Sequence, residues 1–142
     1  MSHSYKDLIA WQKAKRLAVV LYGVTDKFPR SQAFSLTSQL RRCAVSVASN
    51  IAEGQGRKTR GEFVQFLGNA RGSLLELQTQ IEIAFELKYV SHDDHCTVEQ
   101  LSGDVLGLVN RLMESLETEV HQERARPASN VKRETLKRET LK

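Results

Sequence analysis

Two amphipathic segments joined by a short basic loop constrain this chain more than any other feature. Apolar residues recur every three or four positions on both sides of the loop, which is the pattern of an amphipathic helix. They are Leu36, Leu40, Cys43, Val47 and Ile51 before the loop, and Phe63, Leu67, Ala70, Leu74, Leu77, Ile81 and Ala84 after it. The loop region holds three helix-breaking glycines and three cations that a core would not accept: Gly54, Gly56, Gly61, Arg57, Lys58 and Arg60. The sequence therefore predicts a helical hairpin with a basic tip, in which Thr59 caps the helix that follows the loop.

The same periodicity predicts a helix before this hairpin and another after it. The first carries Trp11 on its apolar stripe and ends at Phe28, because the residue before a proline is pushed away from helical dihedrals. The last ends before Pro127. We predict helices near 7–26, 36–54, 61–88 and 97–124. Four such helices make an all-α fold. Because their connections are short, we expect an antiparallel up-down-up-down four-helix bundle.

Length and composition fit one such domain followed by a tail. A chain of 142 residues with 40% hydrophobic residues suits a single core. We predict that residues 1–126 form the bundle and that 127–142 form a basic, disordered tail, in which Lys132–Leu136 is repeated as Lys137–Leu141. No apolar run approaches the roughly 20 residues that span a membrane, and no signal-peptide pattern opens the chain. Cys43 lies on an apolar stripe, where a reduced thiol packs as a small hydrophobe, so we expect a cytoplasmic protein.

Charge is distributed unevenly along the chain. Residues 1–72 hold twelve Lys and Arg against four Asp and Glu, whereas residues 73–142 hold nine against thirteen. This asymmetry indicates a basic face that binds a polyanion or an acidic partner, although basic and acidic faces can also simply meet each other or solvent. The candidate nucleic-acid-binding residues are Arg41, Arg42, Arg57, Lys58, Arg60 and Arg71. Because we expect no surface aromatic residues between these cations, we expect electrostatic rather than base-specific contacts.

Motifs for catalysis and metal binding are weak. The loop fails the P-loop pattern, since Arg57 separates Gly56 from Lys58 and the preceding segment is helical. Among the polar residues of the second helix, Ser46, Ser49 and Asn50, we expect local hydrogen bonds rather than a nucleophile. The carboxylates Glu53, Glu62 and Glu76 form no paired motif like that of di-iron bundles. We therefore predict no catalytic residue, no cofactor and no enzyme.

The segment Tyr89–Cys96 invites a metal interpretation. Three potential ligands, His92, His95 and Cys96, fall within five residues, and they would need a fourth from elsewhere. We prefer a polar turn in which Asp93 or Asp94 caps the last helix, and we predict no metal.

The helix predicted at 61–88 has a second face of small and apolar residues. At about 100° per residue, Val64, Gly68, Gly72 and Leu75 lie away from the stripe that begins at Phe63. Glycine inside a helix costs about 1 kcal/mol relative to alanine, so two on one face suggest close packing with another helix. We take these four residues as a candidate oligomer interface.

Particular motifs resemble those of the small bacterial four-helix-bundle proteins of the ribosomal RNA intervening-sequence (S23) family. The resemblance covers roughly residues 5–120. The matching motifs are Asp7-Leu8 with Trp11-Gln12, Phe28-Pro29, Leu36-Thr37-Ser38-Gln39 with Arg41-Arg42, Ser49-Asn50-Ile51-Ala52-Glu53-Gly54, Gly56-Arg57, Glu62-Phe63, and Gly72-Ser73-Leu74 with Glu76-Leu77. The chain departs from the family at Ala48, where proline is usual, and at Lys88, where glycine is usual.

The resemblance implies an antiparallel four-helix bundle that assembles as a homopentamer. It also implies likeness to the accessory proteins of diversity-generating retroelements, which bind nucleic acid and a reverse transcriptase. Two hypotheses therefore stand: a homo-oligomeric module that binds RNA or other nucleic acid through phosphate contacts, and a scaffold that docks an acidic partner protein such as a reverse-transcriptase-like one.

Overall fold

The computed structural model of the chain describes residues 4–126, and these residues are helical apart from short connections. The main elements are α1 (Ile9–Thr25), α2 (Leu36–Gln55), α3 (Arg60–Glu86) and α4 (His92–Ala125). Two single 3₁₀ turns, η1 (Tyr5–Asp7) and η2 (Arg30–Gln32), precede α1 and α2. The predicted all-α fold is confirmed, and the described part of the chain contains no strand.

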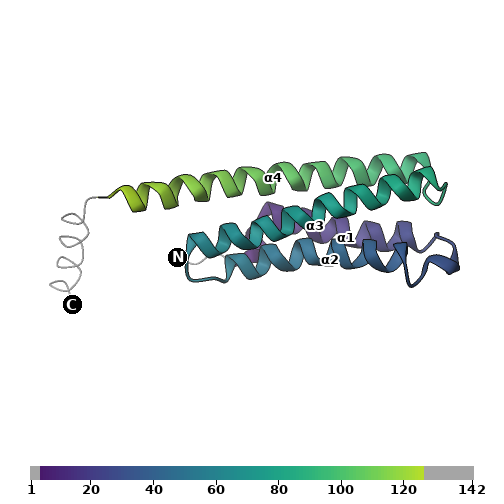
Figure 1. Cartoon of the computed structure of the whole chain (residues 1–142), viewed down its shortest axis with the longest axis horizontal. Coiled ribbons are helices and arrows are strands. Elements are labelled where there is room, and N and C mark those ends of the chain that lie inside the picture. The colour runs from purple at the N-terminus through teal and green to yellow at the C-terminus, as the bar shows by residue number, and fades with distance from the viewer. Residues whose placement is uncertain (1–3, 127–142) are drawn as a thin grey trace.

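The helices pack as an antiparallel up-down-up-down bundle (Figure 1). α1 packs against α2 and α4, and α3 packs against the same two helices from the other side. The connections α1–α2 and α3–α4 lie together at one end of the bundle, which we call the two-loop end. The connection α2–α3 lies at the opposite end, the one-loop end, and α4 extends beyond the other helices there.

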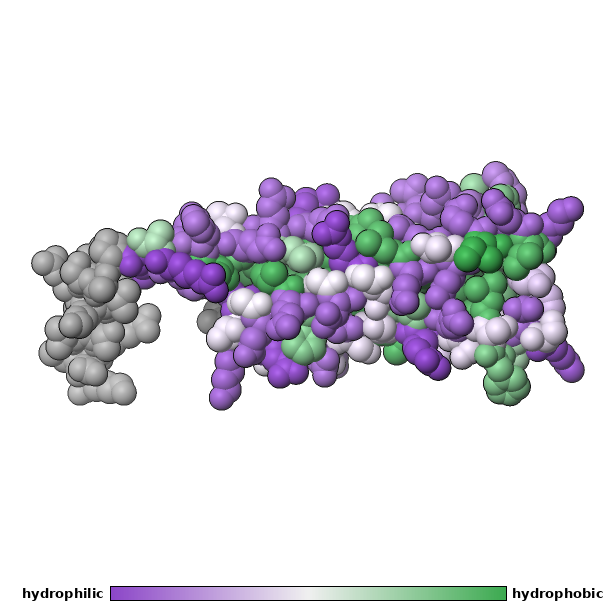
Figure 2. Space-filling view, viewed as in Figure 1, coloured by the Kyte–Doolittle hydropathy of each residue, from purple (hydrophilic) through white to green (hydrophobic). Residues whose placement is uncertain are grey.

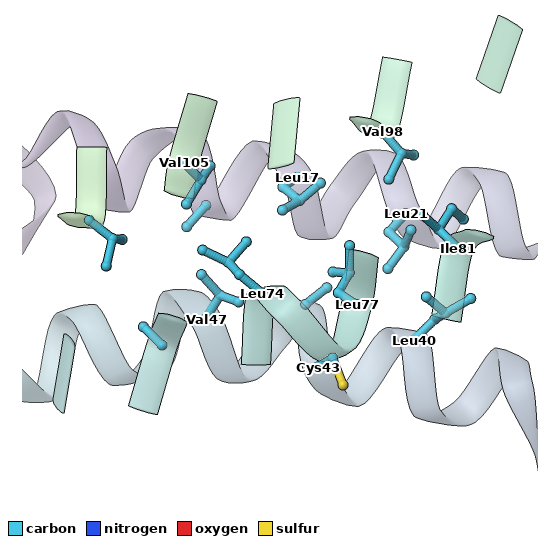
Figure 3. Packing of buried hydrophobic residues seen from close by; sticks show 14 of the residues in the cluster. Leu17, Leu21, Leu40, Cys43, Val47, Leu74, Leu77, Ile81, Val98 and Val105 are labelled. Carbon is cyan, nitrogen blue, oxygen red and sulfur yellow. The ribbon is translucent and has the colours of Figure 1, made fainter. Parts of the chain in front are cut away.

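The core lies along the bundle axis and is made of the predicted apolar stripes. Leu17 and Leu21 of α1, Leu40 and Val47 of α2, Leu74, Leu77 and Ile81 of α3, and Val98 and Val105 of α4 point toward one another (Figure 3). All seven stripe residues predicted for α3 are buried. Burial of a leucine-sized side chain contributes about 1.5–3 kcal/mol, so the leucines of this stripe each stabilise the bundle by an amount of this order.

The start of α4 corrects the sequence prediction. The helix begins at His92 and not near residue 97, and its cap is Ser91 rather than Asp93 or Asp94. The Ser91 hydroxyl accepts a hydrogen bond from the backbone N–H of Asp94. His95 then continues the buried stripe toward Val98, so the segment interpreted as a turn is the first helical turn. The predicted cap of α3 is confirmed, since the Thr59 hydroxyl accepts from the N–H of Glu62.

Gly54 and Lys88 occupy special positions at opposite ends of the bundle. Gly54 belongs to α2 and not to the loop. A Cβ atom there would lie 2.6 Å from the Phe63 ring and 2.9 Å from Cβ of Phe66, so α2 and α3 approach closely because this residue has no side chain. Lys88 follows α3 with a left-handed φ of 65°. The backbone N–H of Tyr89 bonds to the Ala84 carbonyl, which completes a Schellman turn.

The surface of the bundle is mostly hydrophilic on the side drawn in Figure 2, with hydrophobic side chains reaching the surface between charged ones. Within the described residues, every helix is too short or too polar to cross a membrane. The predicted tail, including the repeated segment Lys132–Leu141, lies outside the described residues, and the division into 1–126 and 127–142 stays a prediction.

Candidate nucleic-acid interface

The one-loop end carries three of the predicted cations in different states. Lys58 is exposed in the connection between α2 and α3. Arg57 is also exposed, and its guanidinium lies over the Phe66 ring, 4.4 Å from the ring centre. Arg60 instead forms ion pairs with Glu119 and Glu123 of α4. The first two therefore offer net positive charge, whereas the charge of Arg60 is largely compensated.

The two-loop end carries Arg41 and Arg42 on the first turns of α2. Arg42 is exposed, as predicted. Arg41 is not fully directed outward: only 30% of its side chain is exposed, because the guanidinium folds back onto α1. Its Nε atom donates to Thr25 Oγ1 at 2.9 Å, and the guanidinium lies 4.6 Å from the centre of the Tyr22 ring. An ion pair with Asp26, at 3.8 Å, completes the arrangement and fixes this arginine in place.

The six predicted cations therefore do not form one continuous patch. Arg57 follows Arg41 by sixteen positions, nearly all of them in α2, which is about 24 Å at the α-helical rise. Arg71 lies exposed near the middle of α3, about 16 Å along the helix from Arg60. Within residues 4–126, no carboxylate lies at ion-pair distance from Arg42, Arg57, Lys58 or Arg71.

Aromatic residues accompany the cations at both ends, which corrects the expectation from sequence. Phe66 lies under Arg57, and Tyr22 lies under Arg41. Phe34, in the connection before α2, is fully exposed. Tyr22 precedes Arg41 by 19 residues, so only the α1–α2 turn brings them together. The sequence feature that could have indicated this aromatic surface is Phe34, a large apolar residue in a mostly polar loop.

A surface groove at the two-loop end is lined by these residues. It has a volume of about 490 Å³ and runs between α1 and α2. Its lining residues are Tyr22, Ala33, Phe34, Thr37, Ser38, Arg41, Arg42 and Val45. The groove thus combines two aromatic rings with two arginines.

The potential metal ligands of α4 separate into two groups. His95 is buried and stacks on Phe85 at 4.1 Å between ring centres. Its Nε2 atom lies 2.6 Å from Glu82 Oε1, and its Nδ1 atom lies 3.8 Å from Glu99 Oε2. Ligand atoms of these three residues lie within 4.8 Å of one another, but the two carboxylates flank different ring nitrogens. The ring thus links α3 to α4 through hydrogen bonding, and absence of a metal stays a prediction.

His92 and Cys96 occupy the exposed side of the first turn of α4. Cys96 Sγ lies 3.6 Å from His92 Nε2, one helical turn away. Both are exposed whereas His95 is buried and clusters with Glu82 and Glu99 instead, so the three predicted ligands do not converge. Two exposed side chains are fewer than the three or four protein ligands of a zinc site.

Two of the three polar residues of α2, Ser46 and Asn50, make the local hydrogen bonds expected of them, whereas Ser49 is exposed. Asn50 donates to the Ser46 carbonyl at 2.8 Å, and the Ser46 hydroxyl lies 2.9 Å from that of Ser73 on α3. Cys43 donates to Glu76 at 3.4 Å. Burial, followed by this carboxylate, raises the pKa of the Cys43 thiol to about 11, so it remains protonated and unreactive near neutral pH.

The candidate oligomer interface on α3 is partly occupied by the chain itself. Val64 packs against the core, and a Cβ atom on Gly68 would lie 3.9 Å from the Met113 side chain of α4. Gly72 has open space around it, and Leu75 is 46% exposed. The outward face continues with Ile83, which is 49% exposed.

Comparisons with known proteins agree on the fold. A solved structure from Bacteroides thetaiotaomicron, described as a protein of unknown function from the S23 ribosomal protein family, superimposes with a TM-score of 0.71. It is 20% identical and covers 77% of this chain and 98% of its own, so this likeness speaks for the fold alone. No curated protein matches the chain. The family model described as 23S rRNA-intervening sequence protein matches residues 6–111. The chain therefore belongs to the 23S rRNA-intervening sequence protein family.

Proposed function

We propose that this protein is a non-enzymatic module that binds RNA through phosphate contacts. The observation that carries the proposal is the state of Arg57 and Lys58, two exposed cations in the α2–α3 connection without a carboxylate at ion-pair distance in the described part of the chain. A cation that is not neutralised within its own protein retains its full attraction for a polyanion.

The position of this loop adds to the attraction. Arg57 and Lys58 lie just before Thr59, the N-cap of α3, and the first backbone N–H groups and the dipole of this helix favour an anion. Cys43 and His95, two side chains with catalytic potential, are buried and already hydrogen bonded. The family name refers to ribosomal RNA, which makes RNA the first polyanion to test.

The proposal includes self-association through the outward face of α3. Leu75 and Ile83 leave about half of their side chains exposed on this face, and Gly72 lets another helix approach it. A closed ring of copies, with a pentamer as the first expectation from the family, would repeat the basic loop around one axis and raise the local positive potential.

Gly72→Leu tests this association cleanly. Because nothing lies within 4 Å of the position that a Cβ atom would take there, the larger side chain should leave the monomer fold intact. We expect light scattering to show a multiple of the monomer mass for the wild type and a smaller mass for Gly72→Leu, with unchanged helical circular dichroism. A wild-type monomer at micromolar concentration would contradict the assembly.

The RNA proposal is tested by a salt series with fluorescent RNA. Affinity should fall linearly on a log–log plot as salt rises, through counterion release. The double variant Arg57→Gln/Lys58→Gln should bind more weakly and should flatten the slope by about 1.4, since each phosphate contact with a single strand contributes about 0.7. Arg60→Gln should change the slope less, because Glu119 and Glu123 already compensate this cation.

A matched control removes two exposed cations from other surfaces. Arg16→Gln/Arg111→Gln lowers the net charge by the same amount on α1 and α4. If this control flattens the slope as much as the loop variant, binding follows net charge and the loop is not the site. If the wild type binds no RNA at low salt, the proposal is wrong, and an acidic partner protein becomes the ligand to test.

A further inference from the structure

We infer that the groove at the two-loop end is a second RNA subsite that takes an unpaired nucleobase, which makes single-stranded RNA the preferred substrate class. This inference rests on the proposed RNA binding and adds to it a site far from the basic loop. The groove lies at the start of α2, whereas Arg57 and Lys58 follow the end of that helix.

Phe34 provides the first argument, because its ring is fully exposed. A single exposed apolar side chain is common on a protein surface, but Phe34 lines one groove together with two other exposed apolar residues, Tyr22 and Val45, and such a patch marks an interaction site. Every nucleobase has a flat π face, so an exposed ring stacks on bases regardless of sequence. In duplex RNA the bases are already stacked on one another, and only an unpaired base can use this ring.

Arg41 provides the second argument, because it is held in place before any ligand arrives. Its contacts to Thr25 and to the Tyr22 ring fix the guanidinium at the wall of the groove. An arginine fixed in this way loses little side-chain entropy on binding. Its planar face and its remaining N–H groups suit a base edge or a phosphate.

Arg42 provides the charge that Arg41 lacks. Arg41 shares its charge with Asp26, at 3.8 Å, whereas Arg42 has no carboxylate at ion-pair distance within residues 4–126. A stacked base brings its own phosphate with it, and Arg42 lies on the groove wall to receive that phosphate. Aromatic and cationic groups together are what distinguish single-strand grooves from ordinary apolar patches.

The size of the groove agrees with one or two nucleotides rather than a folded partner. Its volume of about 490 Å³ lies within the range of small-molecule sites. Val45, 45% exposed, adds an apolar side chain to the lining beside the rings. Thr37 and Ser38 add hydroxyl groups to the lining, which can bond to a ribose or base edge.

The test compares single-stranded and duplex RNA of equal length at fixed salt, using fluorescence anisotropy. Phe34→Ala should weaken binding of the single strand about tenfold and leave the duplex within twofold, since stacking on a protein ring is commonly worth a factor of this size. Phe34→Trp should retain the single-strand affinity, and its added fluorescence should be quenched when RNA binds. Ile9→Ala, which removes an exposed apolar side chain from the start of α1, away from the groove and from the outward face of α3, is the matched control and should change neither affinity.

The outcomes separate this subsite from the proposed function. If the loop variant Arg57→Gln/Lys58→Gln loses affinity while Phe34→Ala binds both RNAs as the wild type does, the base subsite is wrong and the RNA proposal stands. If Phe34→Ala lowers the mass of the assembly without changing RNA affinity, the groove is a contact between copies of the chain and the inference is overturned. If the wild type binds neither RNA, both proposals fail together.

Discussion

The two ends of the bundle each place an arginine over an aromatic ring, but they hold it in different ways. At the one-loop end Arg57 contacts Phe66, and its neighbour Lys58 projects from the exposed loop. At the two-loop end Arg41 is bound to Tyr22, Thr25 and Asp26. The first arrangement offers charge that salt can screen, and the second offers a fixed surface that salt affects less. One end is thus suited to attract a polyanion and the other to position part of it.

Both ends are held in place by the same core. The largest effect that we predict is the loss of stability when this core is disrupted. Leu74 is fully buried halfway along α3. Leu74→Ala should lower the free energy of unfolding by about 2–5 kcal/mol, because it removes apolar contacts and leaves a cavity. Urea unfolding followed by circular dichroism measures this loss.

The control for this change is Leu75→Ala, one residue along the same helix. Leu75 is 46% exposed, so its truncation should cost much less than that of Leu74. A loss below about 0.5 kcal/mol for Leu74→Ala would contradict the assignment of the core stripe.

The relative reactivity of the two cysteines tests whether the turn of α2 beside the groove at the two-loop end is closed. Arg42 faces solvent, and the next residue, Cys43, is buried beside Glu76. A pKa raised from 9.0 to about 11 lowers the thiolate fraction of Cys43 about hundredfold at neutral pH. We expect Cys96, which is exposed, to be alkylated first and Cys43 only on unfolding, as counted by mass spectrometry on the wild type and Cys96→Ser.

The same thiol predicts a loss of stability at high pH. The folded state holds the Cys43 proton more tightly than the unfolded state, so its contribution is complete below pH 9 and declines as pH rises toward 11. Cys43→Ala should remove this part of the alkaline decline. Alkylation of native Cys43 as fast as Cys96 would show that this turn of α2 is open in solution.

The sequence predicted the helices well where apolar periodicity and caps coincide. α3 was placed to within two residues at each end, because an uninterrupted stripe and Thr59 mark it. The start of α4 was missed by five residues because polar residues fill its first turn. Ser91 followed three residues later by Asp94 was a usable cap signal, and His95 lies three residues before Val98 on the same face.

The candidate site was less predictable, since its contacts join residues far apart in the chain. Arg60 meets Glu119 and Glu123 about 60 positions away, and no local pattern indicates such a pair. Arg41 reaches α1 because the α1–α2 turn places Tyr22 and Thr25 beside it. A list of cations from the sequence therefore could not separate free charges from compensated ones.

Gly54→Ala tests the packing of the one-loop end and should have the next largest effect. The added Cβ would lie 2.6 Å from the Phe63 ring and 2.9 Å from Cβ of Phe66. One helix must shift to accept it, and we expect a loss of about 1–3 kcal/mol in the free energy of unfolding. Gly72→Ala is the control, because its Cβ meets open space and alanine favours helix. Equal stability of the wild type and Gly54→Ala would mean that α2 and α3 are not this close.

Lys88→Gly is the converse change at the two-loop end, and its effect should be the smallest. Lys88 holds a left-handed φ of 65°, in which an L side chain crowds the neighbouring carbonyl whereas glycine does not. The Schellman hydrogen bonds from Lys88 to Phe85 and from Tyr89 to Ala84 involve only the backbone, so glycine can keep both. Glycine also increases the entropy of the unfolded chain, which offsets part of the relief.

We expect Lys88→Gly to raise the free energy of unfolding, measured in urea, by about 0.5–1 kcal/mol. Lys88→Ala should show no such gain, because it retains the strained backbone. A loss of stability in Lys88→Gly would show that the lysine side chain, rather than the backbone turn, holds this end of α3. Gly54→Ala thus tests whether the one-loop end requires glycine for space. Lys88→Gly tests whether the two-loop end prefers glycine for backbone conformation.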